Sequence, residues 1–542
     1  MIIKKNLFIL LFFIIIFSTG LILYKDYGVS LDEKFHRENG SFWYKYSKNF
    51  ILDNSSPIVE NSEKLIKERI SNGDFIESIP SIQAAPFVII SELFLDILNT
   101  KKESINIYQF AHLFNFIIYF IGLIFFYKLI LKRYKSQLYA FLGVLILFLT
   151  PRIFAESFYN QQDIFFLSMI IINMYTGLNF IENPSAKNTV LFSVSSALAI
   201  DTRIIGIVSV LIFLFLIFLK STKDTLFLKK NYLPIISFFI LTFVFIIIFW
   251  PFLWHNPFSN LFFAMSNLSS VNFDYSILYL GQYILSTNIP WHYPFVWIGI
   301  TSPIIVILFF LIGMLFFTKR ILYRIINLNN KQNDFWKSND EFFDIYFLAI
   351  FFLPLFLYIK KSLGYDGWRH LYFIYPSMIM IFLYGFYRIQ LLFNSKYIKL
   401  IFSSLIIINL FYLLIWNYKY HPHQNVYFNL FAKKNFQNNF EMDYWGLSNR
   451  ESLKYIINNN SNYLPLVATK SFSSLEMSSL IFDENEKNKI EITHNIDEAE
   501  FIVTNYRPLI KRNFIIDKNK YKKYYEILVD GVPINTVYKK VN

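Results

Sequence analysis

Two adjacent carboxylates, Asp32 and Glu33, follow the first long hydrophobic segment of the chain by only a few residues. That segment, from Leu7 to Tyr24, is apolar and long enough to predict a membrane helix, so the acidic pair is expected at the membrane surface. Charge beside lipid is costly and usually functional, although a solvated turn is the simpler explanation of one acidic pair. A carboxylate in such a place can act as a general base toward a hydroxyl group.

Further charged, histidine and aromatic residues interrupt the apolar sequence between hydrophobic runs. Each has a simpler explanation when taken alone. Asp163 can cap a helix that begins at Ile164, Arg203 can extend along apolar surface to the head groups, and aromatic residues near His292 are ordinary at a membrane interface. One of these segments, 151–163, is expected as an outer turn between two spans. Taken together, the segments would supply acids and cations to one membrane face; they contain Arg152, Asp163, Arg203, His292, Tyr365, Asp366, Arg369 and His370.

Composition defines the broad class. Of the 542 residues, 55% are hydrophobic and 20% aromatic, and the mean hydropathy is +0.40. Apolar runs of spanning length recur along the chain, which predicts a polytopic α-helical membrane protein. The net charge of +13 comes largely from lysines and arginines between apolar runs, where they would orient helices, so we expect no nucleic-acid partner. The absence of cysteine excludes disulfides, thiolate metal sites and cysteine nucleophiles.

The apolar runs predict about eleven membrane spans. Two of them, 137–150 and 188–200, are short for the hydrocarbon core, so they are either tilted bundle helices that extend further or re-entrant segments. The full set lies near 7–24, 105–131, 137–150, 164–181, 188–200, 204–219, 232–250, 293–317, 342–360, 371–387 and 397–416.

Loop charges predict the orientation of these spans. Lys4 and Lys5 would keep the N-terminus in the cytoplasm, and the segment from Trp250 to Tyr293, which alternation places outside, contains no lysine or arginine. A cleaved signal peptide is the alternative for the start, but the apolar run continues to Tyr24 without an A-x-A site. The first outer loop is then about 25–104, and the polar segments described above gather on the outer face.

The composition changes after the last span. Residues 417–542 are rich in asparagine, with short β-like runs at 464–468, 501–504 and 525–529 and a predicted helix at 450–458. We therefore expect two parts, a membrane domain at 1–416 and an extracytoplasmic region at 417–542 that contains a small α/β domain.

Acids and cations beside lipid suit the transfer of a sugar from a polyprenyl phosphate. A carboxylate would deprotonate the acceptor hydroxyl, and cations would stabilise the departing lipid phosphate. Arginine suits the second task because its planar fork matches phosphate oxygens and stays charged.

The order of motifs resembles a known family. The chain carries Asp32-Glu33, then Pro151-Arg152 with Asn160-x-x-Asp163, then Arg203-x-x-Gly206, then Tyr365-Asp366-Gly367-x-Arg369-His370, and finally Asp443-Tyr444-Trp445-Gly446. This order resembles the GT-C type glycosyltransferases that use polyprenyl-phosphate donors. Within them it is most similar to the bacterial branch related to protein O-mannosyltransferases and to the aminoarabinose transferase of lipid A.

The resemblance implies roles for individual residues. Asp32 would be the general base, with Glu33 supporting it or exchanging roles. Asp163 would shape the acceptor site or hold a basic partner, while Arg203, Arg369 and His370 would face the donor phosphate. Arg152, Tyr365, Asp366 and His292 are further candidates.

The resemblance also implies the partners. The donor would be a polyprenyl-phosphate sugar, and the acceptor a lipid, a glycan or a protein of the cell envelope. A bacterial inner membrane is the expected location. The chain shows no compact acidic metal motif, so we predict a reaction that needs neither metal nor cofactor. The C-terminal region departs from the simplest members of the family; because of its expected place beside the catalytic loops, we expect it to recognise the acceptor.

Two other functions remain open at this stage. A transporter or flippase of lipid-linked sugars would be equally polytopic, but its polar residues would concentrate at the bilayer midplane in broken, internally repeated helices. A non-catalytic assembly protein is the other alternative, and it would not need the acidic pair.

Overall fold

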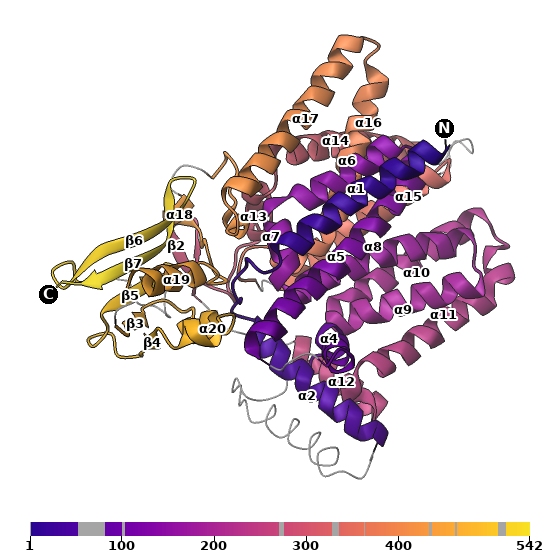
Figure 1. Cartoon of the computed structure of the whole chain (residues 1–542). Coiled ribbons are helices and arrows are strands. Elements are labelled where there is room, and N and C mark those ends of the chain that lie inside the picture. The colour runs from indigo at the N-terminus through magenta and orange to yellow at the C-terminus, as the bar shows by residue number, and fades with distance from the viewer. Residues whose placement is uncertain are drawn as a thin grey trace.

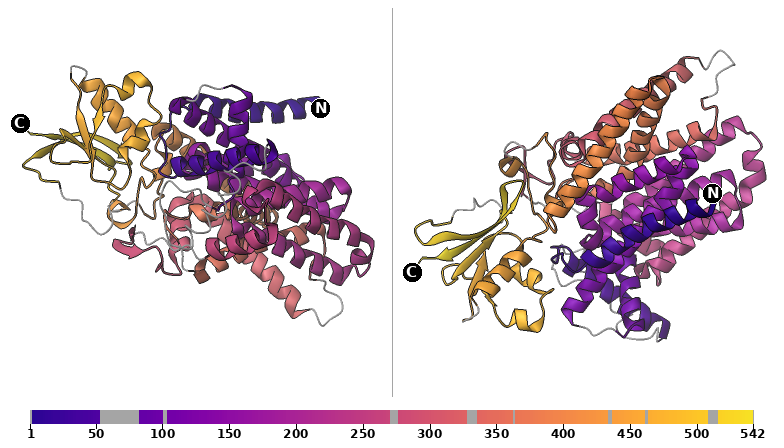
Figure 2. Two further views of the ribbon diagram at one scale, coloured as in Figure 1. Left: turned by 90° about the horizontal axis from the view of Figure 1, so that it is seen from below. Right: turned by 45° about the horizontal axis from the view of Figure 1, so that its top comes forward.

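The computed structural model describes residues 2–52, 82–99, 103–269, 276–327, 335–361, 364–432, 436–460, 463–507 and 516–541. A bundle of helices makes up most of the molecule, and a small sheet domain lies at one end of it (Figure 1). The N-terminal end of α1 points away from the sheet domain in all three views (Figures 1 and 2).

Eight of the described helices are long and apolar enough to cross a membrane. Each predicted apolar run overlaps a helix, which confirms the α-helical membrane fold. The helices of the bundle are α1 (Ile2–Leu23), α5 (Ser104–Tyr134), α6 (Gln137–Leu149), α7 (Pro151–Tyr159), α8 (Gln161–Glu182), α9 (Ala186–Thr202), α10 (Ile207–Lys223), α11 (Phe227–Phe249), α13 (Tyr293–Thr301), α14 (Ile304–Ile326), α15 (Asn339–Lys361), α16 (Tyr375–Leu392) and α17 (Lys396–Lys419).

The predicted outer turn at 151–163 is wrong in its local structure. Residues Pro151–Tyr159 form the helix α7, and all nine of its residues are buried. Proline is favoured in the first turn of a helix, because its missing N–H has no partner to lose there. The axis bends by 68° between α6 and α7, so the short run at 137–150 continues as a broken helix. The run at 293–317 is also broken, between α13 and α14.

A second group of helices lies below the bundle in Figure 1, and its first helix begins at the acidic pair. It comprises α2 (Glu33–Leu52), α4 (Pro86–Ile97) and α12 (Pro257–Ser269). Helices α2 and α4 pack tightly at Gly40, where a Cβ atom would lie 2.2 Å from the Cβ of Val88. This contact holds the helix that starts at the acidic pair against the rest of the molecule.

The C-terminal domain is built on a five-stranded sheet of order β4-β3-β5-β7-β6. Strand β3 pairs in parallel with β4 and β5, whereas β7 pairs antiparallel with β5 and β6. The strands are β3 (Leu466–Thr469), β4 (Glu491–Ile492), β5 (Phe501–Thr504), β6 (Tyr521–Val529) and β7 (Val532–Lys540), and the main helix is α19 (Asn449–Asn459). The small α/β domain expected from the sequence is therefore present.

The sheet domain and the helical part share a hydrophobic core. Val29, which precedes α2, and Tyr108 of α5 belong to the same buried cluster as Leu453, Val467 and Phe501 of the sheet domain. The two parts of the chain are thus packed together at the end of the bundle where Asp32 lies.

Candidate active site

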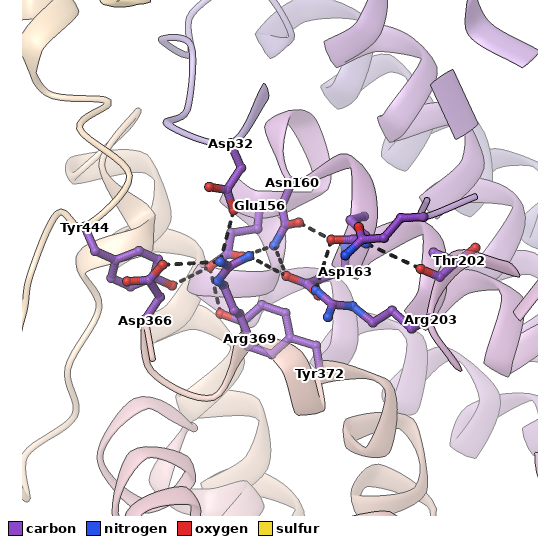
Figure 3. A network of polar contacts seen from close by, with 12 residues as sticks. Asp32, Glu156, Asn160, Asp163, Thr202, Arg203, Asp366, Arg369, Tyr372 and Tyr444 are labelled. Carbon is purple, nitrogen blue, oxygen red and sulfur yellow. Dashed lines mark hydrogen bonds and ion pairs between the residues drawn. The ribbon is translucent and has the colours of Figure 1, made fainter. Parts of the chain in front are cut away.

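Arg369 lies at the centre of a group of three carboxylates (Figure 3). Its Nη2 atom is 3.0 Å from Asp32 Oδ2 and 3.3 Å from Asp366 Oδ2, and its Nη1 atom is 3.1 Å from Asp163 Oδ2. The Arg369 side chain is only 2% exposed. The structure therefore brings together three acidic residues that are more than a hundred positions apart in the sequence, because one arginine fork can donate to several carboxylates.

Two further arginines flank this centre. Asp163 also pairs with Arg203, and Asp366 Oδ1 accepts a hydrogen bond of 2.9 Å from Arg507 Nη2. We call these six residues the Arg369 cluster: Asp32, Asp163, Asp366, Arg203, Arg369 and Arg507. The three aspartates and three arginines balance in formal charge, which is how a buried group of this size can be tolerated.

Local backbone structure places Asp163 and Asp366. Asn160 caps α8, where its side-chain oxygen accepts from the backbone N–H of Asp163 at 3.0 Å. Asp163 is thereby fixed in the first turn of α8, where the helix dipole favours a negative charge. Asp366 has a left-handed backbone with φ of 54°, and Gly367 follows with φ of 71°. This turn directs Asp366 and Arg369 toward each other.

Asp32 is the most accessible carboxylate of the cluster. Its side chain is 33% exposed, whereas those of Asp163 and Asp366 are 1% and 5% exposed. The ion pair uses Oδ2, and no hydrogen bond joins Oδ1 to another residue in the described part of the chain. Asp32 alone among the three can therefore meet a substrate without a rearrangement of the protein.

Glu33 faces a different environment from its neighbour. Oε1 lies 2.9 Å from His112 Nε2 and accepts from Gln161 at 3.4 Å, and Oε2 accepts from the backbone N–H of Ser30 at 2.5 Å. The Glu33 side chain is 1% exposed. These contacts fix the start of α2 against α5 and α8, and so they hold Asp32 in position.

His370, Tyr365 and His36 lie next to the charged groups of the cluster. The rings of Tyr365 and His370 meet edge to face with centroids 4.8 Å apart, and Tyr365 also lies against the Arg369 guanidinium at 5.2 Å. Burial raises the pKa of Tyr365 to about 12, with Arg369 opposing and Asp32 adding to the effect. Burial lowers the pKa of His36, against the opposing influence of Asp32.

A second polar network lies behind Arg369. Glu156 is fully buried in α7, and its Oε1 accepts from the hydroxyls of Tyr372 at 2.8 Å and Tyr444 at 3.1 Å. Its Oε2 accepts from Asn160 at 2.6 Å, and Asn160 also donates to Asp163 at 3.0 Å. These hydrogen bonds connect α7, α8 and the C-terminal part of the chain beneath the cluster (Figure 3).

Among the described residues, neither Arg152 nor His292 forms a hydrogen bond or an ion pair with the Arg369 cluster. Arg152 donates from Nε to the carbonyl oxygen of Tyr427 at 3.1 Å and packs against the ring of Phe428. The His292 Nδ1 atom lies 2.7 Å from the hydroxyl of Tyr279. Both contacts are explained by packing and hydrogen bonding within the fold.

Several residues around the site were not singled out from the sequence. Arg507 and Glu156 are the main ones. Trp445, whose ring lies 4.6 Å from the Arg369 guanidinium, was named in the sequence without a role. Trp445 belongs to the Asp443-Tyr444-Trp445-Gly446 motif, which was a usable signal. Arg507 carried no signal, because it follows a short strand in a polar region that looks like ordinary surface.

The described residues contain no group of three or more histidine, aspartate or glutamate side chains arranged to hold a metal ion. The aspartates of the Arg369 cluster are instead held by arginines. Metal independence remains a prediction.

The comparisons with known proteins agree with the resemblance seen in the motifs. Residues 87–254 match the family model of the dolichyl-phosphate-mannose-protein mannosyltransferases. This segment includes Asp163 and Arg203. No curated protein matches the sequence.

Among solved structures, ArnT from Cupriavidus metallidurans bound to undecaprenyl phosphate is 12% identical, with 98% of both chains covered and a TM-score of 0.43. The same protein in the apo state is 11% identical, covering 99% of this chain and 98% of that chain, with a TM-score of 0.41. These likenesses are too weak to place side chains or ligands.

The family match supports the predicted relation to the protein mannosyltransferases over residues 87–254. That segment supplies one aspartate and one flanking arginine of the Arg369 cluster, and the remaining members come from both sides of it in the sequence.

Proposed function

We propose that the protein transfers a sugar from a polyprenyl-phosphate donor to an acceptor hydroxyl of the cell envelope, on the outer face of the membrane. The observation that supports this most is the position of Asp32. It is a one-third exposed carboxylate held at 3.0 Å by a buried arginine, and the same cluster contains the partly exposed cation Arg203, which pairs with Asp163. General-base attack on a lipid-phosphate sugar needs an accessible carboxylate and a nearby cation.

In the proposed step, Asp32 accepts the proton of the acceptor hydroxyl. The acceptor oxygen forms a bond to the anomeric carbon, and the bond between that carbon and the phosphate oxygen breaks. The bonding electrons leave with the polyprenyl phosphate, whose added charge Arg203 and His370 would stabilise. Arg369 holds Asp32 through Oδ2 and leaves Oδ1 to accept the proton.

The other site residues act through these groups in our proposal. Arg369 is buried and already bound to three carboxylates, so we assign it to positioning Asp32 rather than to binding the donor phosphate. Asp163 holds Arg203 and Arg369 in place. Glu33 anchors the start of α2 and is not an alternative base, because its side chain is enclosed by His112, Gln161 and Ser30.

The location and the division of the chain are part of the same proposal. The N-terminus would lie in the cytoplasm of a bacterium, with residues 1–416 as the catalytic membrane domain and residues 417–542 outside the inner membrane. The acceptor would be a lipid, a glycan or a protein. Helix α17 ends at Lys419, and His421 just after it lies 2.9 Å from Asp26, which precedes Asp32 by six residues. The chain therefore leaves the bundle near the segment that carries Asp32.

The experiment is a transfer assay with the full chain in lipid nanodiscs. Synthetic undecaprenyl-phosphate sugars, one carrying a hexose and one an aminopentose, are the donors, and an envelope extract from cells that lack the gene supplies the acceptors. We expect release of undecaprenyl phosphate with a matching mass increase of an acceptor. Net movement of the lipid-linked sugar across vesicles without any transfer would overturn the proposal in favour of a transporter.

A further inference from the structure

Arg507 is the one member of the Arg369 cluster that comes from the C-terminal sheet domain. It lies just after β5, is 8% exposed, and donates from Nη2 to Asp366 at 2.9 Å. Its Nη1 atom donates to the carbonyl oxygen of Tyr444. The hydrogen bond to Asp366 joins residues 141 positions apart in the sequence.

The contacts of Arg507 lead to Asp32 in three steps. Arg507 binds one oxygen of Asp366, Asp366 binds Nη2 of Arg369 with its other oxygen, and the same Nη2 binds Asp32. All the groups between Arg507 and Asp32 are at least nine-tenths buried. Water is therefore poorly placed to replace a lost partner, and a shift of one member is transmitted to the next.

The base of Arg507 is also firmly placed. Its backbone N–H donates to Asn505 Oδ1 at 3.3 Å, and the Asn505 amide donates to the carbonyl oxygen of Asp443 at 2.8 Å. The guanidinium packs over the ring of Phe472 at 5.0 Å. The position of Arg507 is therefore fixed by contacts with both the sheet domain and the Asp443-Tyr444-Trp445-Gly446 segment.

We propose that Arg507 is a positioning residue of the transfer reaction, through which the docked C-terminal domain fixes Asp366, Arg369 and finally Asp32. This inference rests on the proposed function, because it assigns Arg507 to the reaction in which Asp32 is the base. The sheet domain then has a role in catalysis itself, in addition to any part in acceptor recognition.

The main test replaces Arg507 by glutamine in the nanodisc assay with undecaprenyl-phosphate hexose and the envelope extract. We expect kcat to fall by about 100-fold, the cost of a misplacement near 1 Å, with a much smaller change in the KM for the donor. Arg450→Gln is the matched control. Arg450 also links the sheet domain to the membrane part, through hydrogen bonds of 2.7 Å to the carbonyl oxygens of Lys25 and Tyr27, but it lies outside the cluster.

Rescue by the conservative variant supplies a readout that a purely structural role would not change. Arg507→Lys keeps a positive charge beside Asp366 but loses the planar fork. We therefore expect kcat to recover in part in Arg507→Lys relative to Arg507→Gln, while Arg450→Gln keeps a kcat close to that of the unaltered protein.

A double-mutant cycle with Asp366→Asn separates positioning from direct substrate binding. If Arg507 acts through Asp366, the losses in kcat will be strongly non-additive. Independent losses that multiply, or an Arg507→Gln enzyme with unchanged kcat, would overturn the inference. A thermal stability equal to that of Arg450→Gln shows that a loss is not due to unfolding. If the unaltered protein transfers no sugar, the proposed function itself has failed.

Discussion

Replacement of Arg369 by lysine removes the fork that holds three carboxylates. A lysine ammonium is a point charge on a flexible stem and cannot donate to Asp32, Asp163 and Asp366 in this arrangement. Asp163 keeps Arg203 as a partner and Asp366 keeps Arg507. Asp32 has no second ion-pair partner among the described residues, but its exposure lets water solvate it.

The magnitude follows from these contacts. A hydrogen bond to a charged group contributes about 1.5–3 kcal/mol to the free energy of unfolding. The remaining arginines and water compensate in part for the contacts that are lost. We therefore expect Arg369→Lys to lower the free energy of unfolding by roughly 3 kcal/mol, rather than by the full value of two uncompensated buried charges. Asp32 loses its fixed position, so kcat should fall by about 100-fold or more.

Arg133→Lys is the matched control for Arg369→Lys. Arg133 is 7% exposed and binds both oxygens of Asp344, from Nε at 2.6 Å and from Nη2 at 2.8 Å. It lies near the end of α5, about 30 Å along the helix from His112, which contacts Glu33.

The assay measures transfer from undecaprenyl-phosphate hexose, together with thermal unfolding in detergent. Both lysine variants should lose similar stability, but only Arg369→Lys should lose turnover. Wild-type turnover in Arg369→Lys would refute the positioning role of the fork, and an equal loss in both variants would attribute the effect to stability alone.

Three other predictions concern stability. Burial raises the pKa of Glu441 from its ordinary value of 4.5 to about 8, so the folded state binds this proton more tightly than the unfolded state, and the free energy of unfolding should fall by up to about 5 kcal/mol as the pH rises between these values. Glu441→Gln should remove this fall between unfolding measurements at pH 5 and pH 9. A fall of the same size in the variant would contradict the prediction. Asp344→Ala leaves Arg133 and Arg320 without their shared carboxylate and should lower the free energy of unfolding by about 3–5 kcal/mol. The Asp340 side chain is 43% exposed, so Asp340→Ala should lower it only slightly. Equal losses in the two variants would contradict the prediction. Glu33→Gln weakens the contact with His112 and should lower the free energy of unfolding by about 1–3 kcal/mol, while measurable sugar transfer is kept. A folded but completely inactive variant would make Glu33 a candidate for the base again.

The helical architecture could be predicted because membrane spans are encoded locally. Each span is a run of apolar residues, and the loop charges mark its ends, so no long-range contact is needed to find it. The bend between α6 and α7 could not be predicted in the same way. Pro151 was read as part of a turn, but a proline equally suits the first turn of a new helix, and only packing decides between these two structures.

Part of the site could also be predicted from the sequence, but for a different reason. Asp32, Asp163, Arg203 and Arg369 stood out because charge is rare between apolar runs, and membrane topology required them to share one face. Within the polar C-terminal region a single arginine has no such contrast. The role of Arg507 depends on how the sheet domain docks onto the bundle, which is a property of the tertiary structure that local sequence does not reveal.

Asp32→Asn tests the account most directly. Asparagine has nearly the same shape and can still accept a hydrogen bond from Arg369, so the fold should survive, but it cannot take the proton of an acceptor hydroxyl. With undecaprenyl-phosphate sugar donors and the envelope extract, we expect no detectable transfer by a variant that unfolds at the same temperature as the unaltered protein. Transfer at a near-normal rate would contradict the assignment of Asp32 as the base.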